Sequence, residues 1–173
     1  MGGEAVRNGM ASQRDIIDRR KIEARIAERC ADIGDDAKRR AAALGEIKQV
    51  LADGRAEVRR RFEARRSGGP KAAAELSFLF DQVIRIIHDL AVARYPSANP
   101  TMADRFAVIA VGGYGRGELA PFSDIDLLFL FPYKQPPRGE QLVEFMLYFL
   151  WDLGLKVGHS TRSIEDCIRL AKR

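Results

Sequence analysis

Two short apolar runs, Phe106–Val111 and Asp126–Phe131, constrain the fold of this chain more than any other feature. Both are rich in β-branched or aromatic residues. The first ends at a Gly-Gly pair and the second at Pro132, a pattern typical of short buried strands. Only a glycine-rich segment separates them, so the chain between Val108 and Leu128 is predicted to form a hairpin of two strands.

Helical spacing dominates the sequence before these strands. Apolar residues recur at that spacing from about Asp15 to Arg66, and Gly34-Asp35-Asp36 divides this stretch into two helices. Ser67-Gly68-Gly69-Pro70 ends the second helix, and a third, more apolar helix is expected over about residues 72–93. After the hairpin, the pattern predicts a helix over 140–153, a third strand over 155–161 and a last helix whose N-cap is Ser163.

These elements predict an α+β fold, in which N-terminal helices precede a small mixed-sheet core. We expect three parts in the chain: a flexible tail over residues 1–13, a helical region over 14–100 and a partial core over 101–173. The core is expected to be truncated at its C-terminal end.

The net charge of +5 comes wholly from the N-terminal third. Residues 1–66 hold 17 Lys and Arg against 12 Asp and Glu, whereas residues 67–173 hold 12 of each. A basic surface can attract nucleic acid or an acidic partner, but a solvated helix face is the favoured interpretation. The chain has two cysteines, no zinc-type ligand spacing and no run long enough to span a membrane, which fits a reducing, cytoplasmic setting.

The segment between the two strands carries the residue types of a site for nucleotide and metal. Gly112 and Gly113 let the backbone approach a phosphate closely, because no Cβ intrudes. A short helix is expected to follow, with free N–H groups facing phosphate oxygens and Arg116 adding charge-assisted hydrogen bonds. Asp124 and Asp126 are spaced i and i+2, so their carboxylates share one strand face. Together with triphosphate oxygens they would form the oxygen-rich site that magnesium prefers.

Other interpretations of these residues fail on their spacing. Asp-x-Asp alone would more often be a solvated strand entry, but the combination with Gly-Gly and two apolar strands favours a catalytic site. A Walker loop needs Gly-x-x-x-x-Gly-Lys-Ser/Thr, which is absent. A Rossmann fingerprint starting at Gly113 would have Glu118 in place of its third glycine.

The string G-G-Y-G-R-G-E-L-x-P-x-S-D-I-D-L-L over residues 112–128 resembles the PII uridylyltransferase/uridylyl-removing enzymes, within the polymerase-β-type nucleotidyltransferase superfamily. The stretch Leu150–Arg162 is similar to the same enzymes, and the resemblance covers about residues 106–170. Glutamine-synthetase adenylyltransferases share Ser-Asp-Ile-Asp-Leu. The later Gly-Leu-x-Val-Gly-His-Ser favours the uridylyltransferases.

The resemblance implies transfer of UMP from UTP to a tyrosine of the trimeric PII nitrogen-regulatory protein, with Mg²⁺ or Mn²⁺ and release of pyrophosphate. Asp124 and Asp126 would be the catalytic metal ligands, and the nucleotide would be bound by Gly112, Gly113, Arg116 and Ser123. In this family a downstream HD domain removes UMP and C-terminal ACT domains sense glutamine. The chain is therefore expected to be an N-terminal fragment of such an enzyme.

The residues alone leave the acceptor open, because a fold does not fix a substrate. RNA, a small molecule or glutamine synthetase could accept the nucleotide on the same fold, although nucleic acid is not favoured. A regulatory module without catalysis is the other alternative, and the intact Asp124 and Asp126 argue against it.

A third carboxylate is missing from the expected strand over residues 155–161, where Lys156 stands at a position suited to an acid. Superfamily members generally use such an acid to complete one metal site and to help deprotonate the attacking hydroxyl. The resemblance suggests that it follows the helix beginning near Ser163. The 173-residue chain by itself is therefore expected to bind UTP but to transfer UMP weakly or not at all.

Several other residues carry two interpretations each. His159 could contact nucleotide or orient a carboxylate, but a structural role is favoured. Ser123 could bond a phosphate or simply cap its turn, and Glu118 could reach the metal or form a surface ion pair. Trp151 and His88 are expected in the core.

Overall fold

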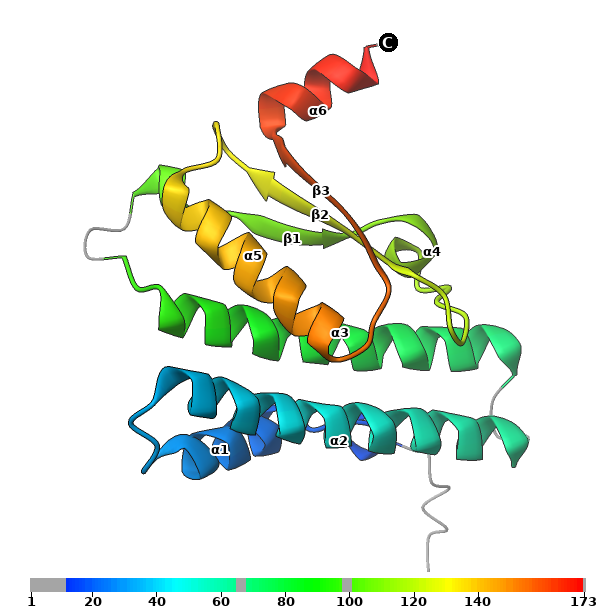
Figure 1. Ribbon diagram of the computed structural model, residues 1–173. Coiled ribbons are helices and arrows are strands. Elements are labelled where there is room, and N and C mark those ends of the chain that lie inside the picture. The colour runs from blue at the N-terminus through cyan, green and yellow to red at the C-terminus, as the bar shows by residue number, and fades with distance from the viewer. Residues whose placement is uncertain (1–11, 65–67, 98–100, 173) are drawn as a thin grey trace, which may run out of the picture.

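The computed structural model describes residues 12–64, 68–97 and 101–172. Three helices come first, α1 Arg19–Cys30, α2 Asp36–Glu63 and α3 Gly69–Arg94, and α1 and α2 pack below α3 (Figure 1). The break between α1 and α2 lies at the expected Gly34-Asp35-Asp36, and Asp35 accepts a hydrogen bond from the N–H of Lys38 as the N-cap of α2.

The boundaries predicted between the three parts of the chain can be compared with the structure only in part, because some of these residues lie outside the described ranges. Residues 1–11 of the expected tail are among these, and Ser12 already caps a 3-10 helix, Gln13–Asp15. The boundary expected at residue 100 also lies outside the described residues. A second 3-10 helix, Met102–Asp104, leads into the sheet.

A three-stranded mixed sheet follows, in the order β1-β2-β3. Strand β1, Ala107–Ala110, is antiparallel to β2, Ile125–Phe131, and strand β3, Val157–Ser163, runs parallel to β2. The α+β class with a mixed sheet is therefore confirmed. The third strand begins two residues later than expected: Leu153 and Gly154, the latter at φ 76°, form a turn after the preceding helix, and Leu155 and Lys156 lie between this turn and the strand.

One face of the sheet is covered by helices α3 and α5, Pro137–Asp152 (Figure 1). Alternate residues of β2 point into this layer: Ile125, Leu127, Phe129 and Phe131 are all at most 2% exposed. A Cβ on Gly139 would stand 2.5 Å from the ring of Phe131, so α5 packs closely on this face. The opposite face, which carries Asp126, Leu128 and Leu130, is only half-buried.

Three expectations for helical residues were wrong. Helix α5 begins at Pro137 and not at Glu140, because proline fits the first helical turn, where its missing N–H would have no partner. Trp151 is 44% exposed, since the buried stripe of α5 runs through Met146 and Leu150. His88 is half-exposed and contacts the ring of Phe106 and the carboxylate of Asp89.

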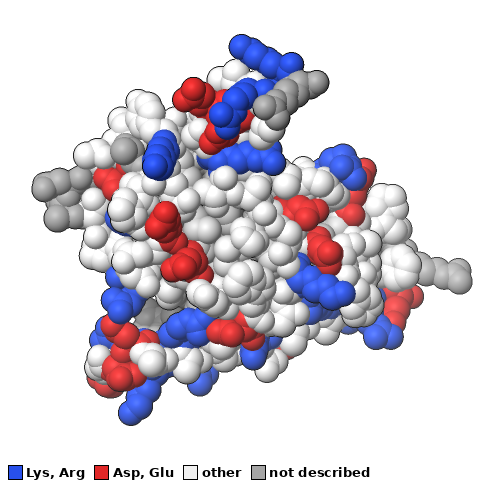
Figure 2. Space-filling view, turned by 45° about the horizontal axis from the view of Figure 1, so that its top comes forward, with Lys and Arg blue, Asp and Glu red and all other residues white. Residues whose placement is uncertain are grey.

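The basic N-terminal helices are tied to their neighbours by ion pairs. Arg40 pairs with Asp152 of α5 at 2.6 Å, and the carboxylate of Glu46 accepts from both Arg25 and Arg29 of α1. Figure 2 shows charges of both signs along these helices, with no continuous basic area on that face. The described helices include none with the length and apolar character needed to cross a membrane. The ion pairs of Arg25, Arg29 and Arg40 agree with the interpretation of the basic excess as a solvated helix face.

The last helix, α6 Ile164–Ala171, begins as expected at Ser163. The Ser163 hydroxyl accepts from the N–H of Asp166, and the Asp166 carboxylate accepts from the N–H of Ser163. This capping box also lowers the pKa of Asp166, because the hydroxyl and N–H of Ser163 stabilise the ionised carboxylate.

Candidate functional site

The Gly-Gly pair forms a single helical turn, α4 Gly112–Gly115, directly after β1. Gly112 has φ 61°, the left-handed region that glycine adopts without strain. The turn closes through the N–H of Gly115, which donates to the carbonyl of Val111 at 2.9 Å. The expected short helix is thus present, and it contains the two glycines instead of following them.

The two acids lie at the start of β2. Asp124 is exposed just before the strand, and Asp126 is half-buried within it. Ile125 and Leu127, which alternate with them, are 1% and 2% exposed in the core. This alternation puts Asp126 on the sheet face away from the helices, and Asp124 stands one residue before the strand begins.

The carboxylate of Asp126 lies between two glycines, one from the α4 turn and one from strand β3. A Cβ on Gly112 would stand 2.6 Å from its Oδ2, and a Cβ on Gly158 would stand 2.4 Å from its Oδ1. Gly158 is the direct register partner of Asp126 across the β2–β3 pairing. Side chains at either position would displace the carboxylate, so both glycines are needed for its position.

Gly158 is a residue of the site that sequence reasoning missed. Its only signal in the sequence is its place in the Gly-His-Ser stretch, in which His159 is the residue with evident binding chemistry. In the structure His159 is the register partner of Leu127, and the centroid of its ring lies 6.1 Å from that of Trp151. It therefore belongs to the helix-covered side, away from Asp126.

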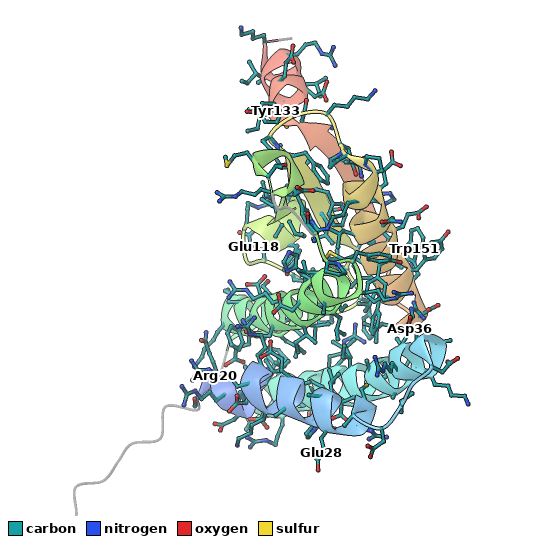
Figure 3. The ribbon with its side chains drawn as sticks, turned by 90° about the vertical axis from the view of Figure 1, so that its left-hand side faces the viewer. Arg20, Glu28, Asp36, Glu118, Tyr133 and Trp151 are labelled. Atoms are coloured by element: carbon teal, nitrogen blue, oxygen red, sulfur yellow. The ribbon has the colours of Figure 1, made fainter. Side chains whose placement is uncertain are left out.

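Arg116 and Glu118 follow α4 and pair with each other. The Nε of Arg116 donates to Glu118 at 2.8 Å, and its Nη1 donates to the carbonyl of Gly112 at 3.0 Å. Both side chains are exposed, and Figure 3 shows Glu118 at the surface beside this turn. Arg116 thus lies next to the glycine pair, and a phosphate there would compete with Glu118 for it.

The turn before the acid pair is strained. Phe122 has φ 69°, the one described non-glycine residue in the left-handed region, and its side chain is 98% exposed. Such a conformation costs on the order of 1 kcal/mol and persists only where the surroundings impose it. Ser123 follows it, exposed, with its N–H donating to the carbonyl of Ala120 at 3.1 Å.

The described part of the chain supplies two carboxylates to this site, those of Asp124 and Asp126. Within that part, no group of three or more His, Cys, Asp or Glu side chains is arranged to hold a metal ion. Strand β3, where a third acid was considered, presents Gly158 to Asp126. Gly158 has no side chain, so this position of β3 adds no third carboxylate.

Comparison with known proteins agrees with this geometry. The family model for a nucleotidyltransferase domain matches residues 97–173. The chain is 52% identical over 160 residues to the bifunctional uridylyltransferase/uridylyl-removing enzyme of Rhodospirillum rubrum, and 52% identical over 162 residues to that of Azospirillum brasilense. The enzyme of Novosphingobium aromaticivorans is 48% identical over 164 residues. No solved structure matches the chain.

These alignments cover 92% to 94% of the chain but only 17% or 18% of each relative. The chain thus spans about a sixth of the length of the relatives that it matches. The nucleotidyltransferase domain match includes β1, α4 and β2, which carry the glycine turn and the acid pair. The chain is therefore similar over more than nine-tenths of its length to bifunctional uridylyltransferase/uridylyl-removing enzymes, and its residues 97–173 match the nucleotidyltransferase domain family.

Proposed function

We propose that this chain carries the nucleotidyl-transfer site of a PII uridylyltransferase, which transfers UMP from UTP to a tyrosine hydroxyl of the PII protein and releases pyrophosphate. The names of the relatives supply the uridylyl group, and the family resemblance supplies the acceptor. Control by glutamine through further domains follows from the same resemblance, and the cytoplasmic location expected from the cysteine content is also part of the proposal.

The observation that carries the proposal is the placement of Asp126. Its carboxylate lies between Gly112 and Gly158, and Asp124 stands exposed two residues before it in the chain. An acid kept clear of side chains on both sides, beside a helical turn of glycines, suits a site where a cation and phosphate oxygens meet. A purely structural acid would gain nothing from two glycine neighbours.

The residues present fit a magnesium ion. Asp124 and Asp126 offer carboxylate oxygens, the ligand type that Mg²⁺ prefers, and they would hold it. When bound, the metal supplies positive charge that favours the ionised form of the attacking hydroxyl and neutralises the leaving pyrophosphate. The N–H groups of the α4 turn would bind phosphate oxygens, and Arg116 would add a charge-assisted bond after leaving Glu118.

The test presents the whole protein with Mg²⁺, each labelled nucleoside triphosphate in turn, and three acceptors: PII protein, glutamine synthetase and RNA. The whole protein is used because the described residues supply only two carboxylates to the site. Label is expected on a PII tyrosine from UTP alone. Label on RNA or glutamine synthetase would contradict the assigned acceptor, and no transfer from any nucleotide would contradict catalysis.

Substitution of Gly113 tests the phosphate-binding role of the glycine turn. A Cβ at Gly113 has no protein atom closer than 3.9 Å, so the folded protein tolerates a side chain there. Gly113→Val is expected to weaken UTP binding about tenfold or more, because the added groups stand where the triphosphate approaches. Calorimetric titration with UTP and Mg²⁺ measures the change.

A matched control is Gly34→Val, in the open loop between α1 and α2, where a Cβ meets nothing within 4 Å. The control is expected to bind UTP as the wild type does. Unchanged affinity in Gly113→Val would remove this glycine from the nucleotide site.

A further inference from the structure

The glycine turn α4 is too short to hold its own conformation. A single turn fixes several backbone dihedrals for one hydrogen bond, so isolated turns of this length are unstable. On one side it rests on β1, where a Cβ on Gly115 would stand 2.5 Å from the carbonyl oxygen of Ala110. Further contacts outside β1 must stabilise the conformation of α4.

Helix α3 contacts the chain at two points, within the α4 turn and just after it. The hydroxyl of Tyr114, a residue that is 4% exposed, donates to Oδ1 of Asp81 at 2.6 Å. One helical turn earlier, the hydroxyl of Ser77 accepts from the N–H of Leu119 at 3.4 Å. The two α3 residues are spaced i and i+4, so they lie on the same helix face.

The hydrogen bond between Tyr114 and Asp81 is short and joins a hydroxyl to a carboxylate. A short bond from a hydroxyl to a carboxylate is charge-assisted. Burial, and then the neighbouring Asp81, raise the pKa of the Tyr114 hydroxyl, so it keeps the proton that it donates. Removing either partner leaves the other without its bond beside a small pocket of about 260 Å³ that α3 lines together with β1.

The neighbours of Tyr114 give this bond its significance. Gly112 and Gly113 precede it directly in α4, and Gly112 lies against the Asp126 carboxylate. We propose that Tyr114 and Asp81 are a positioning pair that holds the glycine turn in the geometry needed to bind the nucleotide. This inference rests on the proposed function, and it gives α3 a part in nucleotide affinity that acts through the glycine turn.

The test compares Tyr114→Phe, Asp81→Ala and Asp81→Asn in the whole protein, by calorimetry with UTP and Mg²⁺ and by the KM and kcat of transfer to PII. Tyr114→Phe and Asp81→Ala are expected to raise the Kd and the KM for UTP about tenfold, the scale of one lost hydrogen bond to a charged group. Their kcat is expected to change much less. Asp81→Asn keeps a carbonyl oxygen that can accept the hydroxyl proton, so it should retain most of the affinity.

Tyr133→Phe is the matched control, because Tyr133 is 63% exposed. It lies in the loop after β2 and is labelled in Figure 3. This variant should leave both constants unchanged. The double variant Tyr114→Phe/Asp81→Ala should have a Kd for UTP no higher than that of the more impaired single variant, since both changes remove the same hydrogen bond.

Two results would overturn the inference. One is wild-type UTP affinity in both Tyr114→Phe and Asp81→Ala. The other is a fall in kcat at constant KM that follows lost thermal stability, which would indicate a structural role only. A wild-type protein that binds no UTP would contradict the proposed function as well, so the failure of the two ideas can be distinguished.

Discussion

Asp126→Asn and Asp124→Asn are each expected to lower the rate of UMP transfer by about 10³-fold or more, the scale on which one electrostatic stabiliser matters in catalysis. Asparagine has nearly the shape of aspartate, so packing beside Gly112 and Gly158 is preserved. The change removes the negative charge that would hold a cation. Initial rates of UMP transfer to PII measure the effect, and thermal unfolding shows whether the fold is intact.

Asp152→Asn is the matched control for these variants. Asp152 is 48% exposed at the end of α5 and pairs with Arg40; an exposed ion pair of this kind contributes about 0–1 kcal/mol to stability. This control should transfer UMP at the wild-type rate. Transfer at that rate by Asp124→Asn or Asp126→Asn would mean that the acid pair is not the metal site.

The features that local sequence determines were predictable. Alternation in β2 requires only that one sheet face be buried, so the spacing of Ile125 and Leu127 already oriented Asp126, which lies between them. The helix start at Ser163 was equally readable, because a short polar side chain beside free N–H groups is a local arrangement, and Gly34-Asp35-Asp36 marked the break between α1 and α2. These elements gave the α+β class and the position of the candidate site.

Errors arose where two local interpretations compete. Pro137 suits both a loop and the first turn of a helix, and packing of Gly139 against Phe131 decides for the helix. Trp151 is a large aromatic residue of an amphipathic helix, so a core position was expected. Its place beside the buried stripe turns it outward, where it contacts Tyr148 and His159.

Contacts between distant segments were out of reach of the sequence. Gly158 opposes Asp126 only because β3 pairs in parallel with β2 after the chain has crossed α5. Tyr114 meets Asp81 across 33 positions of sequence. Register and helix docking depend on how whole elements pack, so the acids were recognised while the residues that position them were not.

Gly158→Ala is expected to lower UMP transfer about 10²-fold, because misplacement of a reacting group by about 1 Å has effects on that scale. The backbone of Gly158 is outside the left-handed region, so alanine adopts it without strain. The added Cβ would stand 2.4 Å from Oδ1 of Asp126, and the carboxylate must move. The measurements are the rate of transfer to PII and the dependence of that rate on Mg²⁺ concentration.

Gly45→Ala is the control, since a Cβ there meets nothing within 4 Å on the exposed side of α2. It should leave transfer unchanged and slightly raise thermal stability, because alanine favours helix over glycine by about 1 kcal/mol. In an Asp126→Asn background, Gly158→Ala should cause little further loss, because both changes act through one carboxylate. If the two losses multiply, or if Gly158→Ala transfers UMP like the wild type, Gly158 has no part in positioning Asp126.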